Sequence, residues 1–200
     1  MKKDFVWLAS ASPRRSELLR QIGVPFRVQA ADIREEQLAG EVPEAYVLRL
    51  AAAKAGAVWA ALAEGERRPV LAADTAVVLD GAVLGKPKDA AEAESMLERL
   101  SGRVHRVLTA VSLRCSADRA TLLSTSEVRF RPTTAAERVA YCATGEPFDK
   151  AGGYGIQGHA AVFVEELRGS YSGVVGLPLF ETAALLARGG FSFWLTARAA

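Results

Sequence analysis

The sequence predicts an α/β fold built on a mixed sheet, and three observations carry this prediction. Segments with helical periodicity alternate with short apolar segments that favour strands. The pair Asp80-Gly81 is typical of a tight hairpin turn, and two long strands at 103–115 and 120–132 are expected to pair. Alternation favours parallel neighbours whereas hairpins require antiparallel ones, so the sheet contains both.

In the first half of the chain, capping residues and turns set the boundaries of the elements. Ser12 is typical of a helix N-cap, Pro13 of the first helical position and Gly23 of a helix stop. The expected order is a strand at 4–9, a helix at 12–23, a strand at 26–31, a long helix at 42–65, and a strand with its hairpin at 68–87.

The second half continues the alternation, with capping-box spacing at two helix starts. Asp89 is followed three residues later by Glu92, and Thr134 by Glu137. The expected order is a helix at 89–102, the two long strands, a helix at 134–145, a glycine-rich loop at 149–160, a strand at 161–167, a second loop at 169–178, a helix at 179–190 and a last strand at 191–198.

Composition indicates a single globular domain spanning residues 1–200. Hydrophobic residues make up 50% and charged residues 24%, and the net charge of +2 argues against a nucleic-acid binder. Cys115 and Cys142 lack CxxC spacing, which indicates core residues in a reducing compartment. The apolar run from Phe5 to Ala9 is too short for a signal peptide, and no run approaches the ~20 residues of a membrane span, so we expect a cytoplasmic protein without a membrane partner.

The segment "SASPRR" departs from ordinary helix-start chemistry. Arg14 and Arg15 fall in the first helical turn, where the backbone is already positive, and each costs about 0.3–1 kcal/mol against the helix dipole. A bound polyanion reverses that sign, because helix amides, the hydroxyls of Ser10 and Ser12, and two forked guanidinium groups all donate to phosphate oxygens. The alternative is two solvated arginines on an exposed turn.

Three further charged residues stand in unusual places. Lys54 lies four residues after Leu50 and four before Val58, on the apolar stripe of the long helix, where it either finds an anion or extends its ammonium to solvent. Asp74 ends an apolar strand and is a candidate general base or metal ligand, or else a turn former. Lys86 follows the hairpin and either folds back beside Asp74 or is exposed.

Together these residues indicate a cleft for a triphosphate. Glu35, which is otherwise a solvated loop residue, supplies a second carboxylate, and two carboxylates hold Mg²⁺ or activate water. The glycine-dense "GYGIQG" lets backbone pass close to a flat ligand, although it is not a dinucleotide fingerprint. No Ser-His-Asp arrangement is visible, so covalent acyl chemistry is not expected.

Long motifs resemble the Maf family of nucleoside triphosphate pyrophosphatases. They are "LASASPRRSELL", "AADTAVVLDGAVLGKPKDAAEAESMLERLSG", "YCATGEPFDKAGGYGIQG" and "GSYSGVVGLPLFET", and they cover nearly the whole chain in order. The resemblance implies an elongated α/β fold with two lobes around a cleft, related to the inosine triphosphatase-like enzymes and often dimeric. It also implies hydrolysis between the α and β phosphates to give a monophosphate and pyrophosphate, with Mg²⁺ or Mn²⁺, and a link to nucleotide house-cleaning and septum formation.

The resemblance assigns roles residue by residue. Asp74 corresponds to the catalytic acid–base residue, and Arg14, Thr75 and Gln157 to positions that govern base recognition. The remaining polar cleft comprises phosphate-binding Ser10, Ser12, Arg15, Lys54 and Lys86, with Glu35 and Asp74 as metal ligands. In "ADIREE" Arg34 stands where an acidic residue is expected, so either Glu35 or Glu36 is the matching carboxylate.

The motif "DKAGGYGIQG" resembles the branch of the family that acts on dTTP and UTP. The Gln157 amide both accepts and donates, so it complements part of the carbonyl–NH–carbonyl pattern of thymine or uracil. Three alternatives stay open: a non-enzymatic nucleotide-binding regulator of cell division, the same hydrolysis of 7-methyl-GTP, or its use on modified pyrimidine or non-standard purine triphosphates.

Overall fold

The computed structural model describes residues 5–116 and 118–191, and one mixed sheet runs through them. Its strands follow the order β2-β1-β3-β5-β6-β7, with β4 paired to β3 beside this path. The strands are β1 (Val6–Leu8), β2 (Phe26–Val28), β3 (Val70–Leu79), β4 (Ala82–Leu84), β5 (Val104–Arg114), β6 (Arg119–Phe130) and β7 (Val164–Arg168). Strand β1 is parallel to β2 and β3, whereas β3, β5, β6 and β7 form antiparallel pairs, so the mixed-sheet prediction is confirmed.

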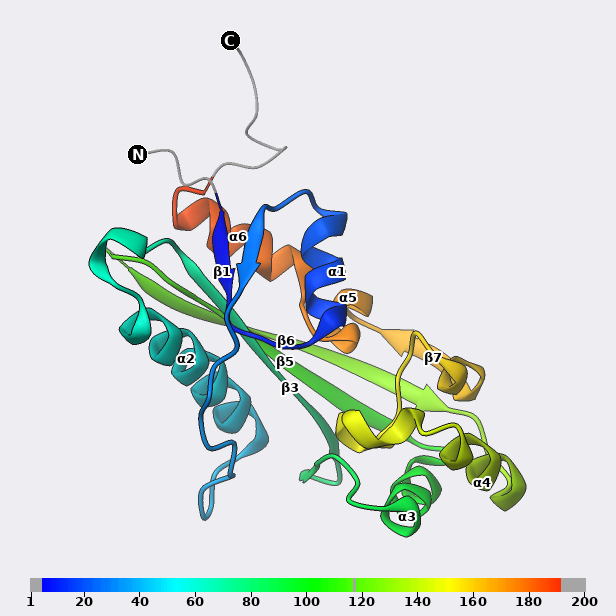
Figure 1. Cartoon of the computed structure of the whole chain (residues 1–200). Coiled ribbons are helices and arrows are strands. Elements are labelled where there is room, and N and C mark those ends of the chain that lie inside the picture. The colour runs from blue at the N-terminus through cyan, green and yellow to red at the C-terminus, as the bar shows by residue number, and fades with distance from the viewer. Residues whose placement is uncertain (1–4, 117, 192–200) are drawn as a thin grey trace.

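Helices cover both faces of the sheet and cluster at its two ends, which gives the molecule the elongated outline seen in Figure 1. Helix α2 runs along one face, α1, α5 and α6 lie at one end of the other face, and α3 and α4 lie at the opposite end. The helices are α1 (Pro13–Gln21), α2 (Pro43–Ala61), α3 (Ala90–Leu100), α4 (Ala135–Ala143), α5 (Tyr171–Val175) and α6 (Leu179–Arg188). None of the helices within the described residues is long and apolar enough to cross a membrane.

Strand β3 is long enough to run through both lobes of the molecule, the first lobe being the end with α1, α5 and α6 and the second the end with α3 and α4. Ala72 and Val78 pack beneath α2. Leu71 packs in the core shared with α1 and α6, while Val77 packs in the core shared with α3 and α4. Because its side chains alternate between the two faces, β3 joins the core under α2 to the core with α1 and α6 and to the core with α3 and α4.

One edge of β3 is only partly paired, and this gap positions the site. Strand β1 pairs with residues 70–71 and β4 pairs with residues 77–79, while β5 pairs with the other edge along nearly the whole strand. Between β1 and β4, residues 72–76 have no strand neighbour on this side among the described residues. Strand β1 ends before α1 begins, and β4 is a short return from β3 through the turn at Asp80 and Gly81, both with positive φ. The gap is therefore a direct result of two short neighbouring strands.

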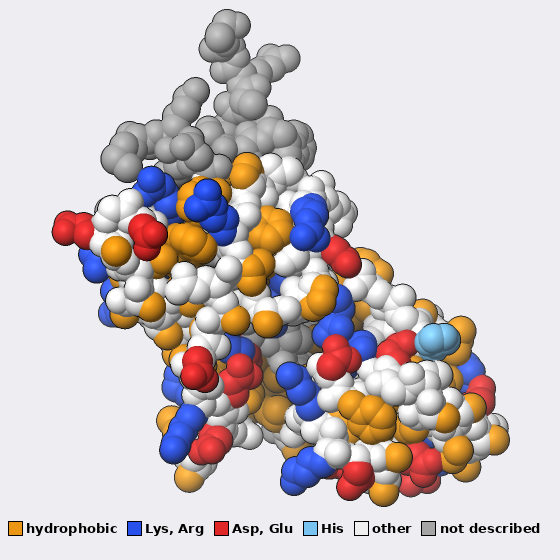
Figure 2. Space-filling model, in the orientation of Figure 1, with side chains coloured by type: hydrophobic (Ala, Val, Ile, Leu, Met, Phe, Trp, Pro, Cys, Tyr) orange, Lys and Arg blue, Asp and Glu red, His pale blue; other side chains and the backbone are white. Residues whose placement is uncertain are grey.

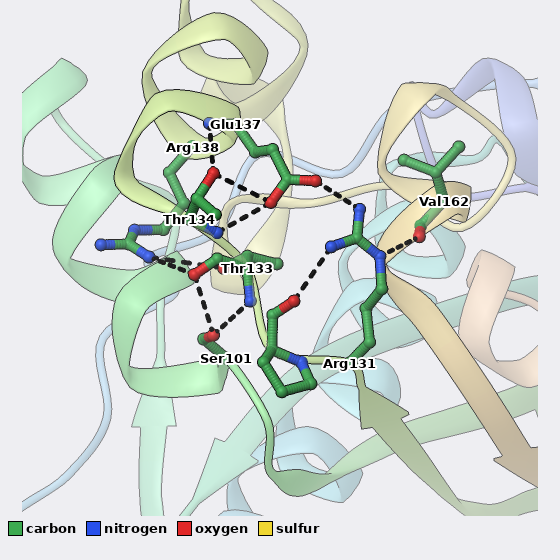
Figure 3. Close-up of polar contacts among 8 residues, drawn as sticks. Ser101, Arg131, Thr133, Thr134, Glu137, Arg138 and Val162 are labelled. Atoms are coloured by element: carbon green, nitrogen blue, oxygen red, sulfur yellow. Dashed lines mark hydrogen bonds and ion pairs between the residues drawn. The ribbon is translucent and has the colours of Figure 1, made fainter.

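The second lobe is fastened by a polar junction around Arg131, shown in Figure 3. The Arg131 guanidinium donates to Glu137 Oε1 at 2.6 Å and to the Val162 carbonyl at 3.0 Å. Glu137 also completes the predicted capping box with Thr134 at the start of α4. The junction ties the end of β6 to α4 and to the 3₁₀ helix η4 (His159–Phe163), which begins where the glycine-rich loop ends.

Several predicted boundaries were wrong. The strand predicted at 26–31 stops at Val28, and the strand predicted at 161–167 begins only at Val164, because residues 159–163 form η4 instead. The predicted loop at 169–178 contains helix α5, whose N-cap Ser170 accepts from the Gly173 amide. The predicted last strand, 191–198, lies outside the described residues apart from Phe191. Cys142 is buried, as predicted for a core residue, whereas Cys115 is only partly buried because it lies just after the end of β5.

Candidate active site

The gap in the β3 edge opens into a cleft of about 440 Å³ where the two lobes meet. Figure 2 shows basic and acidic side chains side by side in this region. All ten residues singled out from the sequence line this one cleft: Ser10, Ser12, Arg14, Arg15, Glu35, Lys54, Asp74, Thr75, Lys86 and Gln157. They come from segments up to 147 positions apart in the chain, so only the fold brings them together.

A buried lysine joins the two carboxylates. Lys54 Nζ lies 2.7 Å from Asp74 Oδ1 and 2.8 Å from Glu35 Oε1. The side chains of Lys54 and Asp74 are 10% and 7% exposed, whereas that of Glu35 is 51% exposed. The lysine on the apolar stripe of α2 therefore meets anions under the sheet and does not extend to solvent.

The structure distinguishes Glu35 from Glu36. Glu35 reaches Lys54 and lines the cleft, whereas Glu36 offers its backbone carbonyl to Arg49 Nη2 at 2.9 Å. Tyr46 on α2 donates its hydroxyl to the Glu35 carbonyl at 2.9 Å. Two side chains of α2 thus hold the loop that carries Glu35 beside Lys54.

Burial raises the pKa of the Asp74 carboxyl above its ordinary value, and the positive charges of Lys54 and Arg15 oppose that rise. A carboxylate that is itself largely buried, and whose ionised form is stabilised by one ammonium, is suited to accept a proton from a bound water. The arrangement around Asp74 therefore has the chemistry of a general base.

Arg15 is held by three acceptors from three parts of the chain. Its Nε donates to the Gly176 carbonyl at 2.8 Å, Nη1 to Ser10 Oγ at 3.0 Å and Nη2 to Thr75 Oγ1 at 3.3 Å. Burial lowers the pKa of Arg15, and the nearby Asp74 carboxylate opposes that fall; a guanidinium remains charged regardless. Arg15 is thus a fixed cation in the cleft wall, held in place by contacts within the protein and suited to bind an anion.

The start of α1 leaves its amides available. Ser12 is the N-cap residue, but its side chain makes no cap hydrogen bond, and the first turn contains no acidic residue. The Ser12 amide donates to Ser10 Oγ at 3.2 Å. Hydroxyls, amides and two arginines therefore surround one helix N-terminus that lines the cleft, as anion binding requires.

Arg14 points across the cleft to the wall that begins at Asp149. Its Nη1 lies 3.1 Å from Asp149 Oδ2, and Asp149 Oδ1 lies 2.5 Å from Lys150 Nζ. Asp149 and Lys150 line the cleft and were not singled out from the sequence, although they open the motif "DKAGGYGIQG". Nothing in a lone Asp-Lys pair distinguishes a cleft wall from a solvated turn, so the local sequence carried no usable signal for them.

The glycine-rich loop is held by two contacts that precede Gln157, which lines the cleft. The Gly152 amide donates to the Gly85 carbonyl at 2.9 Å, so the loop is tied to the segment that carries Lys86. Further along, the Tyr154 hydroxyl lies 2.7 Å from Nε2 of the buried His105. Lys86 and Gln157 line the cleft and are exposed, so the structure agrees with the exposed alternative for Lys86.

The fold and the cleft define a class of α/β protein whose cleft suits a phosphorylated ligand, since a fixed cation and the start of a helix line the same cleft as a buried carboxylate. The family described as Maf-like protein matches residues 5–189. The chain belongs to the Maf family. The assignment of residues 1–200 to one domain stays a prediction.

Curated relatives match nearly the whole chain. A dTTP/UTP pyrophosphatase of Aromatoleum aromaticum is 52% identical, covering 93% of this chain and 96% of that protein. Proteins of the same name from Cupriavidus pinatubonensis and Ralstonia nicotianae are 51% and 54% identical, over 95% and 92% of this chain and 99% and 93% of their own. Among solved structures, the Ham1 protein of Staphylococcus aureus aligns with a TM-score of 0.40 and 14% identity, over 62% of this chain and 71% of that one.

Proposed function

We propose that this protein hydrolyses dTTP and UTP to the nucleoside monophosphate and pyrophosphate. The observation that carries the proposal is a single cleft in which a lysine-bound carboxylate pair faces the arginines of a helix start. Relatives more than half identical over nearly their whole length bear the name of this activity, which supports the choice of dTTP and UTP.

Asp74 is the proposed general base. In the proposed reaction it takes a proton from the water that attacks the α-phosphorus, in line with the departing pyrophosphate. Lys54 keeps Asp74 ionised, and its ammonium lies close enough to both carboxylates to offset charge as the phosphates approach. Arg15, Lys86 and the α1 amides hold the phosphate oxygens.

Glu35 and Asp74 are the proposed holders of a divalent cation, Mg²⁺ or Mn²⁺. The described residues contain no cluster of three or more metal-ligating side chains. Two carboxylates nonetheless fit a magnesium ion, which is bound through one or two carboxylates together with substrate phosphates and water. When bound, such an ion supplies positive charge to the phosphates and lowers the pKa of water.

Arg14, Thr75 and Gln157 are the proposed readers of the base. They differ in chemistry, because a guanidinium only donates whereas an amide and a hydroxyl do both. A homodimer and a part in septum formation are proposed from the family resemblance, and a cytoplasmic location is proposed from the lack of a long apolar run in the sequence.

The test is pyrophosphate release from a panel of UTP, dTTP, CTP, GTP, ITP and 7-methyl-GTP, with Mg²⁺, with Mn²⁺ and with EDTA. We expect UTP and dTTP to be hydrolysed fastest and EDTA to abolish turnover. No turnover on any nucleotide would indicate a nucleotide-binding regulator, and a preference for 7-methyl-GTP or ITP would indicate a different substrate.

Asp74→Asn tests the base. We expect a loss of about 10²–10⁴-fold in kcat with the circular dichroism spectrum unchanged, the usual contribution of a general base. Asp80→Asn is the matched control, because Asp80 sits six residues along the same strand and turn and pairs with Arg103 outside the cleft. Turnover of Asp74→Asn close to wild type, in a folded protein, would remove the role.

A further inference from the structure

Gln157 stands at the tip of a tight turn in the glycine-rich loop. The Gly158 amide donates to the Gly155 carbonyl at 3.0 Å, so Ile156 and Gln157 are the two central residues of this turn. All four residues line the cleft. The position of the Gln157 amide therefore depends on the contacts that hold the two glycines at the base of the turn.

The two glycines are required by close contacts and not by backbone conformation. Neither Gly155 nor Gly158 has a positive φ, so the left-handed region does not demand glycine at either position. A Cβ at Gly158 would overlap the Glu146 carboxylate, and a Cβ at Gly155 would lie 2.6 Å from Lys150 Cε. The base of the turn thus packs directly on Glu146 and Lys150, which explains two glycines of "GYGIQG" without a flat ligand.

The Glu146 carboxylate binds the end of the turn and links it to α4. Its Oε2 accepts from the His159 amide at 2.9 Å and lies 2.8 Å from His159 Nδ1, while its Oε1 accepts from the Tyr141 hydroxyl at 3.0 Å. Burial raises the pKa of the Glu146 carboxyl, but the hydrogen bonds from His159 and Tyr141 lower it by more, so this pKa lies below its ordinary value. The carboxylate is therefore ionised at neutral pH and accepts from all three donors.

Glu146 is itself held in place and stands behind the cleft wall. Its side chain is 14% exposed, and it is not among the described residues that line the cleft. Its amide donates to Thr144 Oγ1 at 3.2 Å, and its carbonyl accepts from Lys150 Nζ at 2.7 Å. A ligand in the cleft meets the loop and not Glu146, so an effect of Glu146 on the ligand has to pass through the loop.

We propose that Glu146 is a positioning residue that fixes the Gln157 amide in the cleft by holding the base of its turn. The inference rests on the proposed function, in which Gln157 reads the base. An amide that is already in place binds the base without first losing the conformational freedom of the loop. Such preorganisation strengthens binding of the substrate and of the transition state alike, so it affects KM and not the chemical step.

The test is a double-mutant cycle of Glu146→Ala with Gln157→Ala, read as kcat and KM for UTP. Alanine removes the carboxylate but keeps the carbonyl that accepts from Lys150. With Gln157 present, we expect Glu146→Ala to raise KM about tenfold and to leave kcat within about twofold. In the Gln157→Ala background it is expected to change KM by less than about twofold, because no amide remains to be positioned. Equal increases in the two backgrounds, or a loss confined to kcat, overturn the inference.

Two further variants separate positioning from stability. Glu146→Gln keeps the length of the side chain and an oxygen for His159, so its KM is expected to lie within about threefold of wild type. Glu137→Ala removes a carboxylate with similar contacts from the other end of α4, outside the cleft, and is expected to leave KM unchanged. A KM that rises as much in Glu137→Ala as in Glu146→Ala shows that lost stability explains the effect, and it overturns the inference.

Gly158→Ala tests the same contact from the side of the loop. Its methyl group overlaps the Glu146 carboxylate and displaces the turn, so we expect KM for UTP to rise about tenfold. A wild-type KM overturns the inference even if Glu146→Ala does not fold. A wild-type protein that hydrolyses neither UTP nor dTTP overturns the proposed function and this inference with it, whereas additive effects in a protein that hydrolyses them overturn the inference alone.

Discussion

At the scale of one residue, Lys54 breaks the apolar pattern of its helix and thereby indicates the position of the cleft. A lysine on the buried stripe of a helix is costly unless an anion accompanies it. Here two carboxylates do so, one from β3 and one from the loop after β2. Burial in turn raises the pKa of Asp74, so the same packing that demands the pair also prepares the proposed base.

Arg14 and Arg15 are adjacent in sequence but are predicted to differ in task. Arg15 is fixed by three acceptors within the cleft wall, whereas Arg14 reaches Asp149 across the cleft. Arg14→Ala is therefore expected to change the ratio of kcat/KM between bases, and Arg15→Ala to depress all substrates alike by about 10²-fold. Steady-state kinetics on UTP, dTTP, CTP and GTP measures both, and matching profiles for the two variants contradict the division of labour.

At the scale of the element, the glycine-rich loop depends on close backbone approach. Gly152 has a φ of +69°, and a Cβ placed there would lie 2.9 Å from the Val77 Cβ on β3. The loop thus lies directly on the strand that carries Asp74 and Thr75, which explains why residues 149–158 form a wall of the cleft.

Gly152→Ala and Gly145→Ala form a matched pair. Both glycines have positive φ, but a Cβ at Gly145 would meet nothing within 4 Å. Gly145→Ala is expected to lower the free energy of unfolding by about 1–2 kcal/mol through backbone strain alone. Gly152→Ala adds overpacking of about 1–3 kcal/mol and shifts the loop that carries Gln157. Urea unfolding and kcat/KM for UTP check this, and equal losses in the two variants would contradict the close-contact argument.

At the scale of the whole molecule, the second lobe supports the cleft through a core of aromatic side chains. His105, Phe130, Tyr154 and Phe163 pack edge-on or tilted against one another, with ring centroids 4.8–6.1 Å apart. Burial lowers the pKa of His105 to about 4, so the folded protein keeps this ring neutral at physiological pH. The loop that bears Gln157 is therefore anchored on a neutral imidazole through Tyr154.

Acid is expected to destabilise the protein partly through His105. In the unfolded chain the ring takes up a proton near pH 6.5, whereas in the folded protein it does so only near pH 4. The stability due to neutral His105 is thus complete above pH 6.5 and is lost as the pH falls towards 4, by about 3 kcal/mol in all. His105→Gln keeps a polar partner for Tyr154 without a titrating group, so its free energy of unfolding should fall less between pH 7 and 4.5. Parallel urea-unfolding profiles for the two proteins over that range would contradict this.

The sequence by itself indicated the fold class and ten of the residues that line the cleft. Alternation of helices with strands and the Asp80-Gly81 turn were enough for a mixed sheet, because these signals are local and periodic. Arg14, Lys54 and Asp74 were noticeable because each breaks a local rule of helix or strand chemistry. The structure brings all three into one cleft.

Only the tertiary structure decided how those residues meet. It placed Glu35 beside Lys54, brought Asp149 and Lys150 to the wall of the cleft, and formed α5 where the sequence indicated a loop. It also placed the Thr109 hydroxyl between Thr75 and the Gly173 carbonyl. The physical reason is that sheet register and the approach of loops to strands are set by packing between distant segments, which no local period encodes.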